Sequence, residues 1–255
     1  MFDFWKKRRR AELRAAPFPD AHRALILENV PYVATLPEAD QRELEALVQV
    51  FLAEKSFEGC GGLTITDEIR VTIAAQACLL LLHRETNMYP ELDSILVYPH
   101  AYRAKGLRRE GLVVMENDQV RLGESWARGT VVLAWDHVQR GARLVGDAQN
   151  VVLHEFAHQL DAEDGSVDGA PDLGARARYI EWAKVLGDEF KELADRVHAG
   201  RASDIDAYAA TSPPEFFAVV TEMFFEAPVK LQQRHPQLYE ELRGFYKQDP
   251  AAHVR

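Results

Sequence analysis

Apolar residues recur at helical spacing over most of the chain. Within residues 20–55 they predict two helices separated near Pro31, and five later segments show the same period of three to four residues. These later helices are expected at about 67–83, 148–162, 174–197, 214–225 and 236–246. Because Ala74–Leu82 is apolar on nearly every side, its helix is expected at the centre of the fold.

Three helix starts carry capping signals. Asp20 and Thr66 stand directly before helical periods and are expected to cap them. Thr35 and Glu38 have the spacing of a capping box, with Pro37 in the first turn. These positions predict where the helices begin.

Residues 94–136 show a different pattern. Ser94–Tyr98 and Thr130–Trp135 are apolar runs of strand length, and Gly111–Met115 with Gln119–Leu122 predict a hairpin. The chain is therefore expected to be an α+β protein, mainly helical, with a small mixed or mostly antiparallel sheet before the helix at 148–162. We expect one domain over 1–255, in which a helical segment at 1–60 packs on a core at 61–255.

Composition narrows the class of protein. Of the 255 residues 47% are hydrophobic and 27% charged, which is typical of a soluble globular chain, and the net charge of −10 argues against direct nucleic-acid binding by the whole surface. Cys60 and Cys78 are too few for a disulfide framework and are expected to be reduced, as in the cytoplasm.

The N-terminal segment combines aromatic residues with a basic run. Phe4 and Trp5 precede five consecutive Lys and Arg residues at 6–10, and no apolar stretch of signal-peptide length follows. We expect a solvated, frayed terminus, and contact of the basic run with a membrane or a nucleic acid stays as the alternative. The longest apolar run, Ile73–Leu82, is about half of the ~20 residues that a membrane span needs, so no membrane partner is expected.

The strongest chemical signal is His154-Glu155-Phe156-Ala157-His158, an HExxH motif. Two histidines four residues apart on a helix face the same way and can bind one Zn²⁺, while the adjacent glutamate can reach a water at the metal. A chance match is expected in about 3% of such chains. Because the surrounding helix is apolar, a metal site is the better interpretation than two histidines on a solvated face.

A catalytic zinc site needs a third protein ligand. Asp164 lies six residues after His158, but Asp161 occupies the glycine position that would turn the chain back toward the metal. Asp161 is better placed to orient a ligand or to cap the helix end.

Glu215 and Glu222 are the other candidates for the third ligand. They lie seven residues apart and share one face of a strongly apolar helix, where each needs a partner. Ser212 and Glu215 also have capping-box spacing. The residues alone favour Glu215 slightly and leave Glu222 open.

Several long blocks resemble the Mlc titration factor A family of zinc metallopeptidases, over nearly the whole chain. The blocks are ITDEIRVTIAAQACLLLL (65–82), ILVYP (95–99), NVVLHEFAHQLD (150–161), YAATSPPEFFAVVTEMFFE (208–226) and the LY…FYKQDP tail (238–250). The family is also similar to the catalytic domain of anthrax lethal factor, another gluzincin, which implies a zincin-like fold.

The resemblance implies one Zn²⁺ per chain, held by His154, His158 and Glu215. It implies Glu155 as general base and Tyr208 as a residue that stabilises the reacting carbonyl oxygen; without the family, Tyr208 is better interpreted as a packing residue. It further implies aminopeptidase-like activity on peptides, a cytoplasmic location, and an Mlc-type transcriptional repressor as partner.

Three alternatives stay open. The chain could be a regulatory repressor-binding protein whose zinc is structural, or a different zinc hydrolase such as an amidase. The strand Thr130–Trp135 could pair with an extended substrate or be a core strand.

Overall fold

The computed structural model describes residues 2–100, 129–143 and 146–253, so the hairpin predicted at Gly111–Met115 and Gln119–Leu122 lies outside the described residues. The elements follow in the order α1 (Phe2–Ala15), α2 (Asp20–Asn29), α3 (Glu38–Glu54), β1 (Ser56–Gly59), α4 (Asp67–Leu79), β2 (Ser94–Tyr98), β3 (Thr130–Ala134), α6 (Trp135–Arg143), α7 (Val151–Asp161), α8 (Arg176–His198), α9 (Pro213–Glu226), α10 (Pro228–Arg234) and α11 (Pro236–Tyr246). Short 3₁₀ turns lie at Pro31–Thr35, Ala162–Asp164, Ala207–Thr211 and Pro250–Ala252. The mainly helical α+β class is confirmed.

The described strands form a sheet of order β1-β2-β3 in which both pairs are parallel. The expectation of antiparallel pairing is therefore wrong for these strands. Parallel neighbours need a long crossover, and α4 lies in the connection from β1 to β2. β1 was missed because it has only four residues and is mostly exposed, so no apolar alternation marks it.

Of the three predicted helix caps, one is confirmed and two are wrong. Thr66 caps α4, since its Oγ1 accepts the Ile69 N–H at 3.3 Å. Asp20 is instead the first residue of α2 and pairs with Arg23. The capping box is also wrong, because Thr35 ends a 3₁₀ turn and its hydroxyl donates to the Tyr32 carbonyl.

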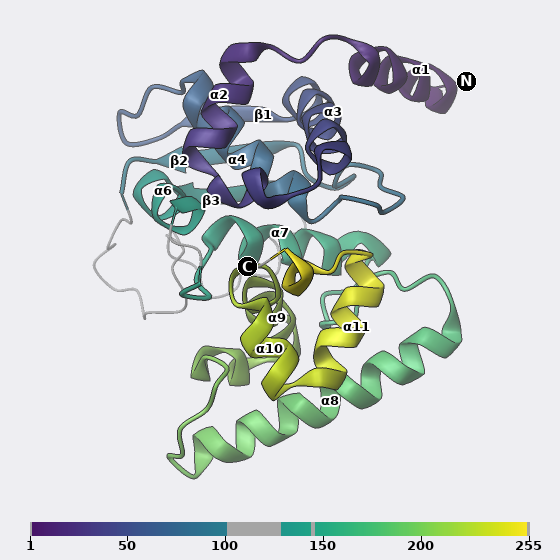
Figure 1. Ribbon diagram of the computed structural model, residues 1–255, viewed down its shortest axis with the longest axis vertical. Helices are drawn as coiled ribbons and strands as arrows, with labels where there is room; N and C mark the ends of the chain where they lie inside the picture. Colours follow the sequence, from purple (N-terminus) through teal and green to yellow (C-terminus); the bar gives the residue numbers. More distant parts are fainter. Residues whose placement is uncertain (1, 101–128, 144–145, 254–255) are drawn as a thin grey trace.

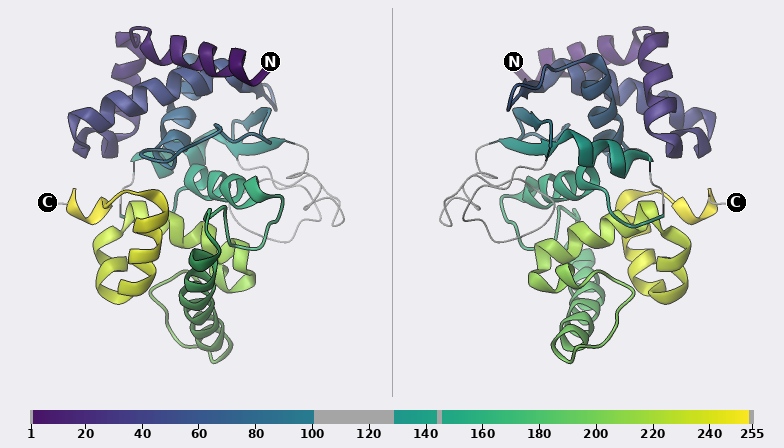
Figure 2. Two further views of the ribbon diagram at one scale, coloured as in Figure 1. Left: turned by 90° about the vertical axis from the view of Figure 1, so that its right-hand side faces the viewer. Right: turned by 90° about the vertical axis from the view of Figure 1, so that its left-hand side faces the viewer.

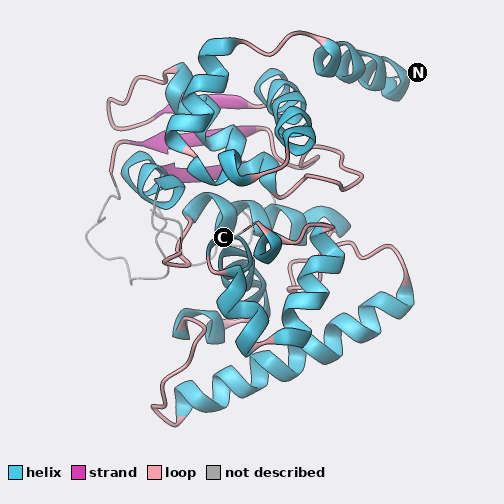
Figure 3. Cartoon of the chain, viewed as in Figure 1, coloured by secondary structure: helices cyan, strands magenta, loops and turns pink. Residues whose placement is uncertain are grey.

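Helix α7 crosses the middle of the molecule (Figure 1). The sheet and α2–α4 lie on one side of it and α8–α11 on the other, and the strands occupy only the first of these halves (Figure 3). α7 contacts α4, α6 and β3 toward the sheet and α9 on the opposite side. Every residue of α7 is buried except His154, which keeps partial exposure.

The chain is helical from its second residue. The frayed-terminus prediction is wrong, because residues 2–15 form α1, which lies against α3 (Figure 2). α2 and α3 pack on α4, and β1 completes one edge of the described sheet. On these contacts we propose that 1–255 is one domain.

Two further predictions concern the cysteines and membrane-spanning helices. Cys60 and Cys78 are both free cysteines, half-buried and buried respectively. Within the described ranges, no helix combines the length and the apolar character needed to cross a bilayer.

Candidate metal centre

The site begins with the cap of α7. Asn150 Oδ1 accepts the N–H groups of Val152 and Leu153, each at 3.1 Å, so two of the unpaired donors at the helix start are satisfied. The predicted motif helix therefore starts at a fixed point, four residues before His154.

His154 and His158 project from the same face of α7. Their ring centroids are 4.9 Å apart, and the two Nε2 atoms lie 3.3 Å from each other. Two imidazole nitrogens aimed at one point form an arrangement that a shared cation stabilises.

Glu215 reaches this point from α9. Ser212 caps α9, and Pro213 and Pro214 form its first turn, which places Glu215 in that turn. Glu215 Oε2 lies 3.1 Å from His154 Nε2 and 3.5 Å from His158 Nε2.

The three atoms form a triangle of the size that a tetrahedral metal requires. Its edges measure 3.1, 3.3 and 3.5 Å. Ligands ~2.0–2.1 Å from a tetrahedral Zn²⁺ lie about 3.3 Å from one another. Among the described residues, this is the one cluster of three or more His, Cys, Asp or Glu side chains compact enough to hold a metal ion.

Glu222 lies on the other side of the His154 ring. Its Oε1 lies 2.7 Å from His154 Nδ1, and its Oε2 accepts the Asn150 N–H at 2.5 Å. A carboxylate at Nδ1 favours the tautomer with the proton on that nitrogen, which leaves the Nε2 lone pair directed at the triangle. The structure thus places the two candidate glutamates differently: Glu215 at both Nε2 atoms and Glu222 at Nδ1.

Burial and charge act on these groups in opposite ways. Burial raises the pKa of Glu155, which is only 4% exposed, to about 8. Burial also disfavours ionised Glu215, but when the imidazoles carry protons on Nε2 in the metal-free protein, hydrogen bonds from His154 and His158 outweigh it and hold the pKa of Glu215 well below its usual range. One site therefore combines a carboxylate whose charged form is favoured with another whose pKa lies near neutral pH.

Tyr208 lies at the same site. It belongs to the 3₁₀ turn Ala207–Thr211, which Asp206 caps by accepting the Tyr208 N–H at 2.8 Å. Its ring centroid is 6.2 Å from that of His154, with the planes tilted by 39°. The turn contacts both α8 and α9.

The two aspartates after the motif do not join the triangle. Asp164 is exposed and accepts the Ser166 N–H at 2.9 Å. Asp161 is fully buried, and both of its oxygens accept the Gly169 N–H at 2.9 Å. Asp161 therefore fastens the loop after α7.

Gly169 connects this loop to α9. Its φ is +81°, and a Cβ there would lie 2.5 Å from the Pro213 carbonyl oxygen. Its own carbonyl accepts from the indole N–H of Trp182 on α8 at 2.9 Å. Asp161, Gly169 and Pro213 thus tie the end of α7 to the start of α9, two residues before Glu215.

Sequence reasoning missed a buried polar network behind the triangle. The Asn150 side-chain amide donates to Gln76 at 2.9 Å, to Glu226 at 3.1 Å and to the Gly141 carbonyl at 3.2 Å. Glu226 also accepts the Gly146 N–H. Two signals were available: an asparagine directly before the apolar period at 151–153, and a glutamine interrupting the apolar run at 73–82.

Comparison with known proteins identifies a family that this chain matches over most of its length. Residues 4–247 match the family described as glucose-regulated metallo-peptidase M90. An uncharacterized protein from Synechocystis is 43% identical over 251 residues, covering 98% of this chain and 91% of its own. Two proteins named Mlc titration factor A are also similar: one from Serratia proteamaculans, 33% identical over 230 residues (89% and 87%), and one from Yersinia pestis, 31% identical over 238 residues (92% and 86%).

Proposed function

The chain belongs to the glucose-regulated metallo-peptidase M90 family and is a metallopeptidase by that membership, and we propose that it is a zinc-dependent, aminopeptidase-like enzyme whose site lies between α7 and α9. The observation that carries the proposal is the triangle of two Nε2 atoms and one carboxylate oxygen, whose edges match those of a zinc tetrahedron.

The proposed ligands of the single Zn²⁺ are His154, His158 and Glu215. Two imidazoles and one carboxylate form a donor set that zinc favours in catalytic sites, where three protein ligands leave a fourth position for water or substrate. A structural zinc site usually has four protein ligands, often cysteines. Neither Cys60 nor Cys78 belongs to the compact cluster, so this comparison favours the catalytic alternative over the structural one.

Glu155 is the proposed general base. It follows His154 directly, is buried, and has a pKa raised to about 8 in these surroundings, so a proton can pass to and from it at neutral pH. Zinc, when bound, supplies a Lewis acid that polarises the scissile carbonyl and acidifies water. Glu155 takes the proton of the attacking water and passes it to the leaving amine.

Tyr208 and β3 are the proposed substrate contacts. The ring of Tyr208 lies beside that of His154, and its hydroxyl is the proposed donor to a carbonyl oxygen developing negative charge. β3 is an outer strand of the described sheet and contacts α7, so its main chain can pair with an extended peptide.

A regulatory role is proposed separately. Relatives from Serratia and Yersinia carry the name Mlc titration factor A, and we propose that this chain, acting in the cytoplasm, likewise binds an Mlc-type repressor. If chelation abolishes hydrolysis but leaves repressor binding intact, the two roles use different surfaces. If repressor binding also requires the metal while no peptide is cleaved, the structural alternative is correct.

The decisive experiment measures metal content together with turnover of a panel of amino-acid nitroanilides and matched simple amides. Glu155→Gln should keep one zinc per chain and lose at least about 10³-fold in kcat. Glu192→Gln, on the exposed surface of α8, is the matched control and should retain activity. Full activity of Glu155→Gln would refute the mechanism, and preference for the simple amides would favour an amidase.

A further inference from the structure

One face of α1 is fastened to the fold. Arg10 donates to both carboxylate oxygens of Glu54 at 2.7 Å, and Arg14 donates to both of Glu43 at 2.7 Å. Leu13 lies between these two arginines and packs against the core. Residues 10, 13 and 14 follow helical spacing, so the face of α1 toward α3 is fixed.

The opposite face exposes two large aromatic side chains. Phe4 is 69% exposed and Trp5 59%, and their rings meet edge to face with centroids 6.3 Å apart. The Arg8 guanidinium lies 5.9 Å from the Trp5 ring centroid and forms an exposed ion pair with Glu12 at 2.9 Å, which water screens. Scattered exposed apolar residues are ordinary, but two adjacent aromatics beside a basic run form a defined surface.

The charge of α1 is opposite to that of the rest of the chain. The helix has six basic and two acidic residues, a net charge of +4, whereas the whole chain carries −10. The remaining residues therefore carry −14. Arg8 and Arg9 are exposed, and α1 lies at the margin of the molecule, near the N label (Figure 1).

We propose that α1 docks the protein on an anionic phospholipid surface through Phe4, Trp5, Arg8 and Arg9. Aromatic rings at the depth of lipid headgroups, flanked by Lys and Arg, are the chemistry by which helices lie on negatively charged bilayers. The helix lies on the membrane without spanning it, so the proposal is compatible with the lack of a spanning helix among the described residues.

A flat partner fits this surface better than a nucleic acid does. A bilayer can touch one helix at the edge of a molecule without running along the acidic body, and electrostatic repulsion from that body falls off over a Debye length of about 8–10 Å. A nucleic acid long enough to bind tightly would continue past α1 along a surface carrying −14, where phosphate is repelled.

The test is co-sedimentation of the full chain, with any tag at the C-terminus, with vesicles of phosphatidylcholine alone or containing about one quarter phosphatidylglycerol. We expect binding to the anionic vesicles only, weakened by salt. Fluorescence should shift to the blue on binding, and Trp5→Phe should abolish that shift.

Variants separate the two contributions to binding. Phe4→Ser with Trp5→Ser should lose at least about tenfold in partitioning, since both rings leave the lipid. Arg8→Gln with Arg9→Gln should lose roughly fivefold per charge. The matched controls lie on the exposed surface of α8: Ile180→Ser for the aromatic pair, and Lys184→Gln with Lys191→Gln for the basic pair. Both should bind vesicles as the parent does. Unchanged circular dichroism and peptidase activity would show that each variant folds.

Four outcomes would overturn the proposal. The first two are no binding to either kind of vesicle and equal binding to neutral vesicles. The third is binding that the α1 and α8 variants weaken equally. The fourth is tighter binding to single-stranded nucleic acid than to anionic vesicles. Concentration-dependent dimerisation that Phe4→Ser with Trp5→Ser removes, without vesicle binding, would instead assign the face to a second copy of this chain.

Discussion

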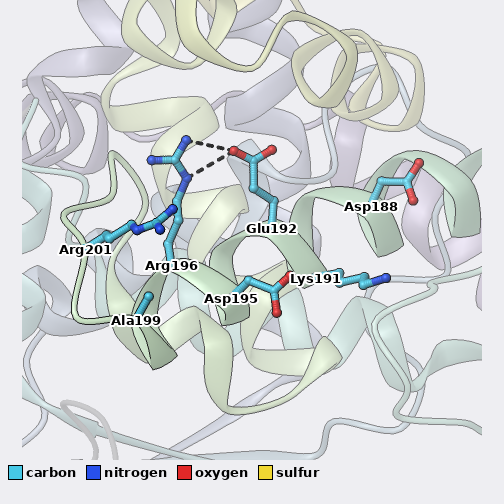
Figure 4. Close-up of a pocket in the computed structure, with 7 residues that line it drawn as sticks. All are labelled: Asp188, Lys191, Glu192, Asp195, Arg196, Ala199 and Arg201. Carbon is cyan, nitrogen blue, oxygen red and sulfur yellow. Dashed lines mark hydrogen bonds and ion pairs between the residues drawn. The ribbon is translucent and has the colours of Figure 1, made fainter.

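Helices α8 and α9 both carry carboxylates, but they place them in opposite surroundings. α8 is 23 residues long and buries only Trp182, Leu186 and Leu193. Its surface holds a depression of about 490 Å³ (Figure 4). The lining is almost wholly charged and consists of Asp188, Lys191, Glu192, Asp195, Arg196, Ala199 and Arg201. In α9, by contrast, every residue from Phe216 to Glu226 is buried.

The candidate site lies where carboxylates are shielded from water, and not at the hollow on α8. Glu192 pairs with Arg196 at 2.8 Å while both side chains stay about half exposed, so the pair contributes little. On α9, burial raises the pKa of Glu226 to about 7, and Glu222 bonds His154 and the Asn150 N–H. Buried carboxylates need specific partners, and on α9 those partners belong to the motif helix.

The largest expected effect comes from a substitution on α9, at the proposed metal ligand. Glu215→Ala removes one corner of the triangle, so we expect loss of stoichiometric metal and at least about 10³-fold lower kcat/KM. Metal content by mass spectrometry and nitroanilide turnover measure it. If Glu215→Ala still binds one metal per chain with parent affinity, Glu215 is not a ligand.

The next effect distinguishes a positioning carboxylate from a ligand. Glu222→Gln can still accept the Asn150 N–H, but its amide nitrogen cannot accept from His154 Nδ1, so the favoured tautomer is lost. We expect zinc affinity to fall about 10–100-fold while the site still fills at high metal concentration. Competition with a chromophoric chelator gives the affinity, and histidine ¹⁵N chemical shifts give the tautomer. Unchanged affinity and tautomer would show that the bond to His154 serves packing alone.

The sequence could identify the histidines but could not decide between the two glutamates. His154 and His158 are related by local helical geometry, which a motif of five residues contains. Glu215 and Glu222 share a face of one helix, and they differ only in where α9 lies along α7. That position depends on distant contacts such as Asp161 to Gly169 and Gly169 against Pro213, which no local pattern encodes.

For the fold too, local patterns could be predicted from the sequence and long-range contacts could not. Long helices such as α8 and α11 were predicted to within about two residues, because many turns contribute to one period. Strand direction was wrong, because pairing joins residues 56, 94 and 130, far apart in the chain. Trp135 was assigned to the last strand, but it begins α6, since a single apolar residue at a boundary suits either element.

A smaller effect concerns pH and the metal-free protein. Burial raises the pKa of Glu155 from 4.5 to about 8, so the unfolded chain releases this proton at lower pH than the folded chain does. The stability that the group contributes is complete below about pH 4.5 and is lost as pH rises to about 8. Because glutamine does not ionise, metal-free Glu155→Gln should be more stable than the parent by on the order of 2 kcal/mol at about pH 8, and by less at about pH 5.5.

Urea unfolding of both chelated proteins at the two pH values measures this difference. A pH-independent difference would mean that Glu155 is solvated in the metal-free protein. The expected gain links site and stability: the same burial that prepares Glu155 for proton transfer destabilises the metal-free fold near neutral pH.

The smallest expected effect lies in the depression on α8. Glu192 and Arg196 are four residues apart, with the acid nearer the helix N-terminus, which is the favourable order (Figure 4). Their side chains are 63% and 47% exposed, so water screens the pair, and Glu192→Gln should cost no more than about 0.5 kcal/mol. Urea unfolding in low and high salt measures this, and zinc content and turnover should match the parent. A loss above about 1 kcal/mol, or any loss of metal, would mean that the charged depression is coupled to the site and that burial alone does not separate α8 from α9.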